Sequence, residues 1–308
     1  MGVSRDVREL LADADPAGDL VVDEERARAD LEAILLRPRE RARGRWRARV
    51  LAAGLAGAAV AVALVLLPES GGGGSAYAYT PPPLDYVAIP TDRTPRELLE
   101  EIADRTAALP EPAGRADEIS YRSWSLSTSI TEEATESEII TSEAHVVLHP
   151  DGSRTATYTR PGGPETFEDA PDAWSRPAPA GEAFASWLEA AYGQPIQDPH
   201  FLESAIHDLL TSQVLSSGAR AALLRMIAAL PGLEYDGRVT DRIGRDGEAF
   251  SAMTSRGGLP TRHTFIIDPA TGDLLGKEET LTENAGALNV PVPSVISYTA
   301  FLASHRTG

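Results

Sequence analysis

Hydrophobic and polar positions divide the chain into four regions with different patterns. Residues 1–49 carry short helical stripes, 50–67 form one unbroken apolar run, 68–83 are rich in glycine and proline, and 84–308 mix strand and helix patterns. These patterns predict a helical tail, a transmembrane helix, a flexible linker and a large folded domain. The expected fold class is α+β, with short N-terminal helices, one membrane-spanning helix, and an antiparallel sheet packed on helices.

The large domain begins with a clear helix signal. Thr94, Pro95 and Glu97 match a capping box with proline at the first helical position, so a helix should run to about Leu109. Apolar periodicity predicts further helices at about 181–193, 199–214 and 217–230. Alternating patterns predict strands at 118–130, 138–149, 154–160, 233–241, 247–255, 261–268, 274–282 and 294–302. Strands, then helices, then strands again indicate one domain whose antiparallel sheet covers the helices.

Two turns in this domain have recognisable chemistry. Pro150-Asp151-Gly152-Ser153 joins two predicted strands as a hairpin turn. The segment from Asp268 to Asp273 is predicted to be a tight hairpin loop, with Gly272 as its residue of positive φ. Both turns require strands that are neighbours in an antiparallel sheet.

The unbroken apolar run, Val50–Leu67, has 18 residues of alanine, glycine, leucine and valine only. As a helix it would be about 27 Å long, close to the ~30 Å of a bilayer core. Trp46 could anchor it at the interface, and Pro68 ends it. The alternative is a buried core helix, but such a helix rarely lacks polar residues on every side. The run therefore predicts one membrane span, with the lipid bilayer as its partner.

Basic residues gather on one side of this run only. Seven arginines precede it at every second position: Arg37, Arg39, Arg41, Arg43, Arg45, Arg47 and Arg49. This bias places the N-terminus in the cytoplasm and the C-terminal domain outside the cell membrane. The net charge of −18 lies wholly in residues 50–308, which argues against nucleic-acid binding. The sequence Ala76-Tyr77-Ala78 also resembles a cleavage site, so processing there stays an open alternative.

The tail contains an amphipathic helix that has no visible partner. Residues 23–36 place four apolar side chains on one face, namely Ala27, Leu31, Ile34 and Leu35. A similar short amphipathic helix is expected at 4–13, and two short helices cannot bury a core of their own. This face is therefore a candidate contact for a cytosolic protein.

Candidate chemistry is sparse in the sequence. There is no cysteine, no G-x-S-x-G and no S-x-x-K. His145 and His149 would lie about 13 Å apart on a strand, and His200 and His207 about 10 Å apart on a helix, which is too far for either pair to share an ion. An EF-hand-like spacing at 13–24 lacks a ligand at Ala17. We expect no catalytic residue, no cofactor and no metal, and predict that the chain is not an enzyme.

Three stretches carry a resemblance to known proteins: RARADLEAIL at 26–35, ALPGLEYDGRVTDRIGRDGEAFS at 229–251 and FIIDPATGDLLGKE at 265–278. In these the chain resembles actinobacterial single-pass membrane proteins of uncharacterised function, often encoded beside sigma factors of RNA polymerase. The resemblance implies a regulatory or sensing protein that couples an envelope domain to a cytosolic partner, for which a sigma factor is the candidate. The alternative is a tethered envelope domain that binds a lipid or another apolar ligand between sheet and helices.

Overall fold

The computed structural model describes residues 79–308, with gaps at 131–134, 161, 256–257 and 289. The expected tail, membrane span and most of the linker lie outside the described residues. Between residue 79 and the C-terminus, those gaps apart, no helix is both long and apolar enough to cross a bilayer.

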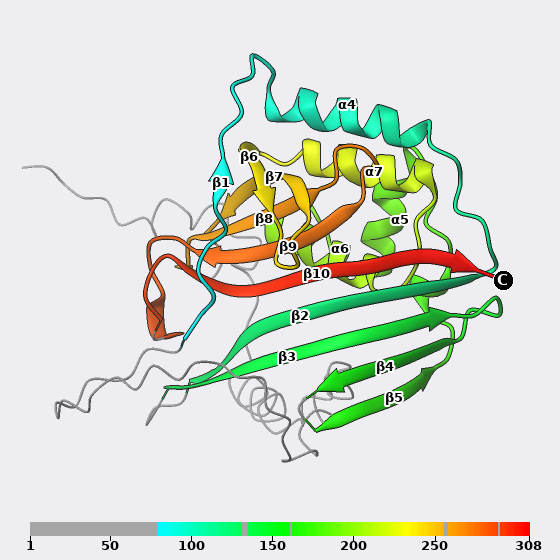
Figure 1. The fold of residues 1–308 in the computed structure, drawn as a ribbon, viewed down its shortest axis with the longest axis horizontal. Helices are drawn as coiled ribbons and strands as arrows, with labels where there is room; N and C mark the ends of the chain where they lie inside the picture. Colours follow the sequence, from blue (N-terminus) through cyan, green and yellow to red (C-terminus); the bar gives the residue numbers. More distant parts are fainter. Residues whose placement is uncertain (1–78, 131–134, 161, 256–257, 289) are drawn as a thin grey trace, which may run out of the picture. The chain divides into compact units, whose positions relative to one another are not determined.

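The described part of the chain builds one ten-stranded antiparallel sheet (Figure 1). Its spatial order is β1-β6-β7-β8-β9-β10-β2-β3-β4-β5. The strands are β1 (Tyr86–Val87), β2 (Ala116–Ile130), β3 (Thr135–Leu148), β4 (Arg154–Arg160), β5 (Gly163–Asp169), β6 (Glu234–Thr240), β7 (Asp246–Thr254), β8 (Thr261–Ile267), β9 (Leu274–Leu281) and β10 (Ser294–Thr307). The long strand β10 joins the two runs of strands, because it pairs with β9 on one side and β2 on the other.

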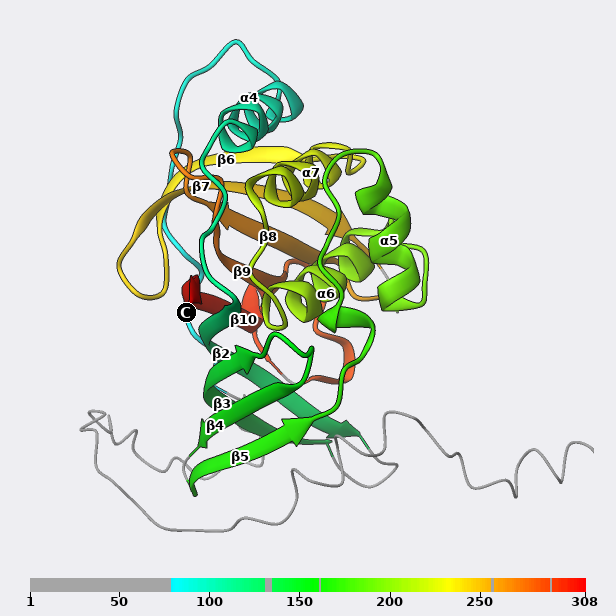
Figure 2. The same ribbon diagram turned by 90° about the vertical axis from the view of Figure 1, so that its right-hand side faces the viewer.

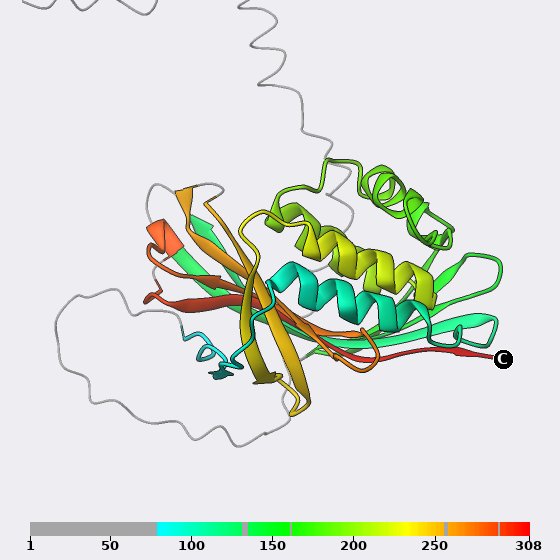
Figure 3. The same cartoon turned by 90° about the horizontal axis from the view of Figure 1, so that it is seen from above.

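In the part of the chain that the structure describes, four α-helices lie over one face of this sheet (Figure 2). They are α4 (Pro95–Ala107), α5 (Ala183–Tyr192), α6 (Pro199–Leu210) and α7 (Ser217–Ala228). Short 3-10 turns lie at Ala173–Ser175 and Gly286–Leu288. Helices α4 and α7 lie side by side over the sheet (Figure 3), although more than 100 positions separate them in the sequence.

Side-chain caps fix where the helices begin. Thr94 and Glu97 form the predicted capping box of α4: the Thr94 N–H donates to Glu97 Oε2 at 2.7 Å, and the Glu97 N–H donates to Thr94 Oγ1 at 3.2 Å. Asp198 caps α6 by accepting from the His200 N–H at 2.9 Å, and Ser216 caps α7. These caps set which helix faces meet the sheet.

The sheet buries apolar residues on both faces. Phe265 and Ile267 belong to the large core beneath the helices, and Ile266 between them belongs to a smaller cluster with Val239 and Ala249. Successive side chains on a strand point to opposite faces, so the smaller cluster lies on the other side of the sheet. The described residues thus supply a complete core of their own.

The predicted α+β class and the antiparallel sheet packed on helices are confirmed. Both predicted turns form, with φ of 85° at Gly152 and 70° at Gly272. Helix α6 ends at Leu210, four residues before the predicted end, because the next residues turn away and the Val214 N–H donates to Asp117.

Two strands were not predicted, and one is longer than expected. Gly163–Asp169 is an edge strand whose residues are mostly exposed, so it has no alternating apolar pattern to detect. Strand β1 has only two residues. Strand β10 continues to Thr307, five residues past the predicted end, because its polar last residues pair with β2.

Candidate ligand cavity

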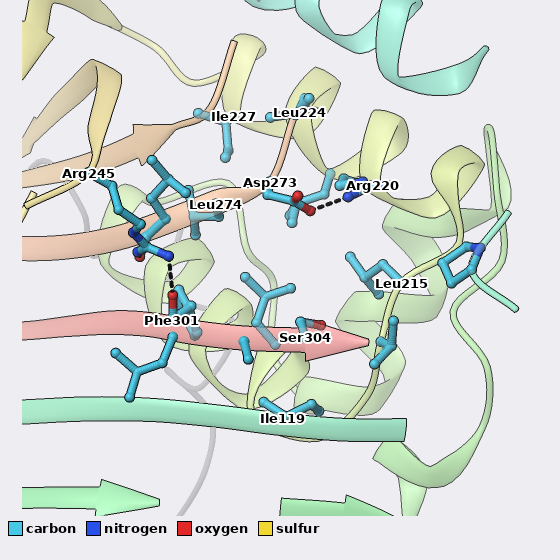
Figure 4. A pocket seen from close by; sticks show the side chains of 18 residues that line it. Ile119, Leu215, Arg220, Leu224, Ile227, Arg245, Asp273, Leu274, Phe301 and Ser304 are labelled. Carbon is cyan, nitrogen blue, oxygen red and sulfur yellow. Dashed lines mark hydrogen bonds and ion pairs between the residues drawn. The ribbon is translucent and has the colours of Figure 1, made fainter. Parts of the chain in front are cut away.

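A cavity lies beneath α7 where strands β9 and β10 separate. The two strands pair from Leu281–Ser294 to Gly276–Ala300. Beyond Ala300, β10 continues along β2 to Thr307 but has no further pairing with β9. The sheet is therefore open on one side of β10, and the cavity occupies this place (Figure 4).

Apolar side chains from four directions line the cavity. Helix α7 contributes one stripe, with Leu223, Leu224 and Ile227 at helical spacing. The sheet, the end of α6 with the segment after it, and the segment before β2 provide the remaining apolar walls: Pro112, Ile119, Leu210, Val214, Leu215, Leu274, Leu275, Phe301, Leu302 and Ala303. The volume is about 180 Å³. That is near the ~150 Å³ of an engineered cavity that binds benzene, and below the roughly 300–1,000 Å³ of common ligand pockets.

Arg245 closes one end of the cavity and holds the parted strands. Its guanidinium donates to the backbone oxygens of Phe301 on β10 and Leu275 on β9, both at 2.7 Å. Its Nε donates to Asp241 Oδ2 at 2.8 Å. The arginine thus replaces the missing strand-to-strand hydrogen bonds, with its own charge balanced by a buried carboxylate.

Arg220 contributes a second polar group to the cavity lining. It forms an ion pair with Asp273, and Figure 4 shows the two side chains meeting between α7 and the start of β9. The Arg220 side chain is 17% exposed, and its Nε is buried without a hydrogen-bond partner among the described residues. A buried N–H of this kind is costly unless an acceptor reaches it. The cavity therefore combines mostly apolar walls with a bordering arginine whose Nε donor is buried next to it.

The site residues expected from sequence cannot be placed against this cavity. The tail face at Ala27, Leu31, Ile34 and Leu35, the arginines at 37–49 and Trp46 all lie outside the described residues. The six histidines are described. His145 and His149 are far from forming a shared site: they bond to Ser120 and Thr155, respectively.

The cavity residues themselves were missed by the sequence reasoning. They come from α6, α7, β2, β9, β10 and four connections, and only the tertiary fold brings them together. One local feature of the sequence could have pointed to the cavity: the TDRIGRD turn at 240–246 places Arg245 directly before a strand. In the structure this arginine bonds to the backbone of β10 and not only to neighbouring surface residues. Its importance depends on a strand separation that periodicity does not report.

Comparisons with known proteins give only distant likenesses. No family model and no curated protein matches the chain. A DUF1329 family protein from Desulfovibrio piger covers 70% of this chain and 94% of its own, at 9% identity and a TM-score of 0.21. A domain from Vibrio parahaemolyticus named for outer membrane lipoprotein sorting covers 68% and 91%, at 10% identity and a TM-score of 0.20. With TM-scores this low, neither likeness carries a functional conclusion, and the chemistry of the cavity has to supply it.

Proposed function

We propose that this chain is a single-pass membrane-anchored protein whose C-terminal, extracytoplasmic domain binds an apolar ligand in the cavity beneath α7. The ligand class is a single alkyl or acyl chain that ends in a hydrogen-bond acceptor. One observation carries this proposal: a cavity of about 180 Å³ with mostly apolar lining residues, bordered by Arg220, whose buried Nε has no hydrogen-bond partner among the described residues.

The apolar walls select the chain part of the ligand. Leucine, isoleucine and phenylalanine side chains dominate the lining, and such surfaces favour removal of hydrocarbon from water. The volume fits part of one chain and not a complete two-chain lipid. The opening between β9 and β10 gives the remainder of the chain a route out of the domain.

Arg220 selects the head of the ligand. A carboxylate, phosphate or ester oxygen near Nε would satisfy the buried donor, and an anionic oxygen would form the stronger bond. Asp273 already neutralises part of the arginine charge, so a neutral ester oxygen also fits. A plain hydrocarbon would leave the donor unused.

The membrane anchor follows from the sequence pattern at 50–67 and the arginines before it. The linker at 68–83 would keep the cavity near the extracytoplasmic surface of the cell membrane, where single-chain amphiphiles are found. This placement gives an apolar-ligand domain ready access to its ligand.

The test uses residues 76–308 and a fluorescent fatty acid whose emission rises in an apolar site. We expect saturable binding that unlabelled fatty acid displaces. Ser304 lies on the exposed lip of the cavity, so Ser304→Trp should block entry. The matched control is Ser127→Trp, an exposed serine on the same sheet that does not line the cavity. Equal binding by both variants would refute the proposal.

A second variant tests the head of the ligand. Arg220→Gln removes the charge and the Nε donor but keeps a polar side chain. We expect weaker binding of the fatty acid and little change for its neutral alcohol of equal chain length. Loss of both ligands in equal measure would mean that the arginine only maintains the shape of the cavity.

A second function rests on the tail. The amphipathic face at Ala27, Leu31, Ile34 and Leu35 favours a cytosolic protein partner, and the family resemblance makes a sigma factor the first candidate. In that case the outer domain would sense its ligand and the tail would report it. Residues 1–49 should then recover a sigma factor from cytosol, and an Arg26/Leu31/Ile34 triple-alanine tail should not.

A further inference from the structure

Three side chains with metal-binding atoms meet between α6 and the sheet. His200 lies in the first turn of α6, His263 on β8 and Glu279 on β9. His263 and Glu279 are direct cross-strand partners on the face beneath the helices. One ligand atom from each of the three residues lies within 4.8 Å of the others.

His263 is the strongest sign that something binds here. Its side chain is fully buried, and neither ring nitrogen has a hydrogen-bond partner among the described residues. Buried polar atoms are nearly always partnered, and each exception needs an explanation. The ring of His200 approaches it edge-on, with centroids 5.8 Å apart, so the two imidazoles face one small region.

The charges around the cluster favour a cation. The carboxylate of Glu279 belongs to the cluster itself, and the carboxylate of Asp198 accepts a hydrogen bond from the His200 N–H beside it. Across the described ranges, neither carboxylate lies within ion-pair distance of an arginine or lysine, and the nearby Lys277, which also interacts with the charge of Glu279, is paired with Glu203.

We infer that His200, His263 and Glu279 form a binding site for a divalent transition-metal ion of the zinc class. Two imidazoles and one carboxylate are a known Zn²⁺ ligand set, which leaves a fourth position open. Ligand atoms in a tetrahedral zinc site lie ~3.3 Å apart, given bond lengths of about 2.0–2.1 Å. From a spacing of at most 4.8 Å, the ligand atoms would approach one another by no more than about 1.5 Å on binding the ion.

Asp198 would support the site from outside the ligand set. Its Oδ1 accepts from the His200 N–H at 2.9 Å, and its Oδ2 accepts from Thr254 Oγ1 on β7 at 3.5 Å. The first turn of α6, which carries His200, is thereby tied to the sheet before any ion binds. An ion would connect α6 to β8 and β9 through three ligands. Sequence reasoning missed this site because it compared only histidines close together in the chain.

The test uses the full chain in detergent, without a polyhistidine tag and stripped of metal by a chelator. Zn²⁺ affinity is measured by competition with a chromogenic chelator, and Co²⁺ supplies a visible spectrum of the coordination geometry. The variants are His200→Ala and Glu279→Gln, because both side chains are only partly buried and the isosteric glutamine keeps the packing. His305→Ala is the matched control, since that histidine is 57% exposed and lies at the far end of β10.

We expect one Zn²⁺ per chain, a tetrahedral Co²⁺ spectrum and a higher melting temperature with zinc. Each ligand variant should weaken the affinity at least tenfold, since even the loss of an outer-shell partner costs that much. The control should bind like the wild type. The inference is overturned if the wild type binds no zinc, if both ligand variants bind as tightly as the wild type, or if the control loses as much affinity as they do. Melting curves of the metal-free variants show whether each is folded.

Discussion

Helices α6 and α7 pack on the same face of one sheet and both bury apolar residues, but α6 adds a buried ion pair and two histidines to its contacts. Under α7 the contacts are apolar and surround a cavity. Under α6 the helix presents His200, Glu203 and His207 to polar strand residues, and Glu203 forms a buried ion pair with Lys277. Strand β9 contributes to both regions. Its sequence LLGKEE changes from apolar residues at the cavity to charged residues under α6 within six positions.

This difference shows two ways to fix a helix on a sheet. Apolar contacts have no direction, so α7 can be held firmly by its flanks and still leave a space beneath it. A buried ion pair and buried histidines require partners at defined positions, so α6 has one allowed register. The non-directional apolar contacts surround the candidate ligand cavity, and the directional polar contacts surround the candidate metal site.

Breaking the ion pair under α6 should have the largest effect on stability. Burial lowers the pKa of Lys277 to about 8, so the ammonium still predominates at pH 7 and pairs with Glu203. Lys277→Met leaves a buried carboxylate alone and should lower the free energy of unfolding by about 3–5 kcal/mol. Urea unfolding of residues 76–308 measures this loss.

The matched variant for this prediction replaces both partners. Glu203→Leu with Lys277→Met removes both charges and should restore stability to near the wild-type value or above it. A double variant that is as unstable as the single one would show that the pair is needed for its packing and not for its charge balance.

Enlarging the cavity under α7 should have the next largest effect. Leu223 is 2% exposed and lines the cavity. Leu223→Ala should cost about 3 kcal/mol of unfolding free energy and shift the preferred ligand to a longer chain. Leu209→Ala on α6 is the control, because that leucine is fully buried but does not line the cavity. It should lose comparable stability with no change in preferred chain length, as read from a series of fatty acids.

The sequence predicts this comparison only in part. Helical periodicity located α6 and α7, and the alternation at 261–281 located β8 and β9. Periodicity does not reveal that β10 parts from β9 after Ala300, which is what creates the cavity. It also cannot show that His263 faces Glu279, because a register shift between Ile266 and Ile267 brings His263 opposite Glu279 instead of Glu278. Both candidate sites depend on how the strands pair and how the helices pack on them. Local sequence patterns locate the helices and strands but do not specify this arrangement.

Acid should weaken the α6 interface through His207. Burial lowers the pKa of His207 to about 4, and Thr299 Oγ1 lies 3.4 Å from its Nδ1. The unfolded chain, with a histidine pKa near 6.5, binds more protons than the folded chain between these values, so stability falls as pH decreases from 7 toward 4. The loss from this group should be about 2 kcal/mol between pH 7 and pH 5. Urea unfolding at both pH values measures it.

The control for this pH dependence is His207→Gln, which cannot titrate. Its unfolding free energy should change less between pH 7 and pH 5 than that of the wild type, by about the same 2 kcal/mol. Identical pH dependence in the two proteins would place the acid sensitivity in other groups.

The smallest effect is expected for an ion pair that lies outside both interfaces. Arg122 and Glu143 meet across β2 and β3 at 2.8 Å, and both side chains are half exposed. Arg122→Met should change the free energy of unfolding by no more than about 1 kcal/mol, because water and salt screen the pair. Repeating the urea unfolding in high salt should abolish even this difference, while the loss caused by Lys277→Met should persist, since salt does not enter the buried site. A large, salt-insensitive loss of unfolding free energy in Arg122→Met would contradict this ranking. It would mean that the exposed ion pair between β2 and β3 contributes as much to stability as the buried pair under α6.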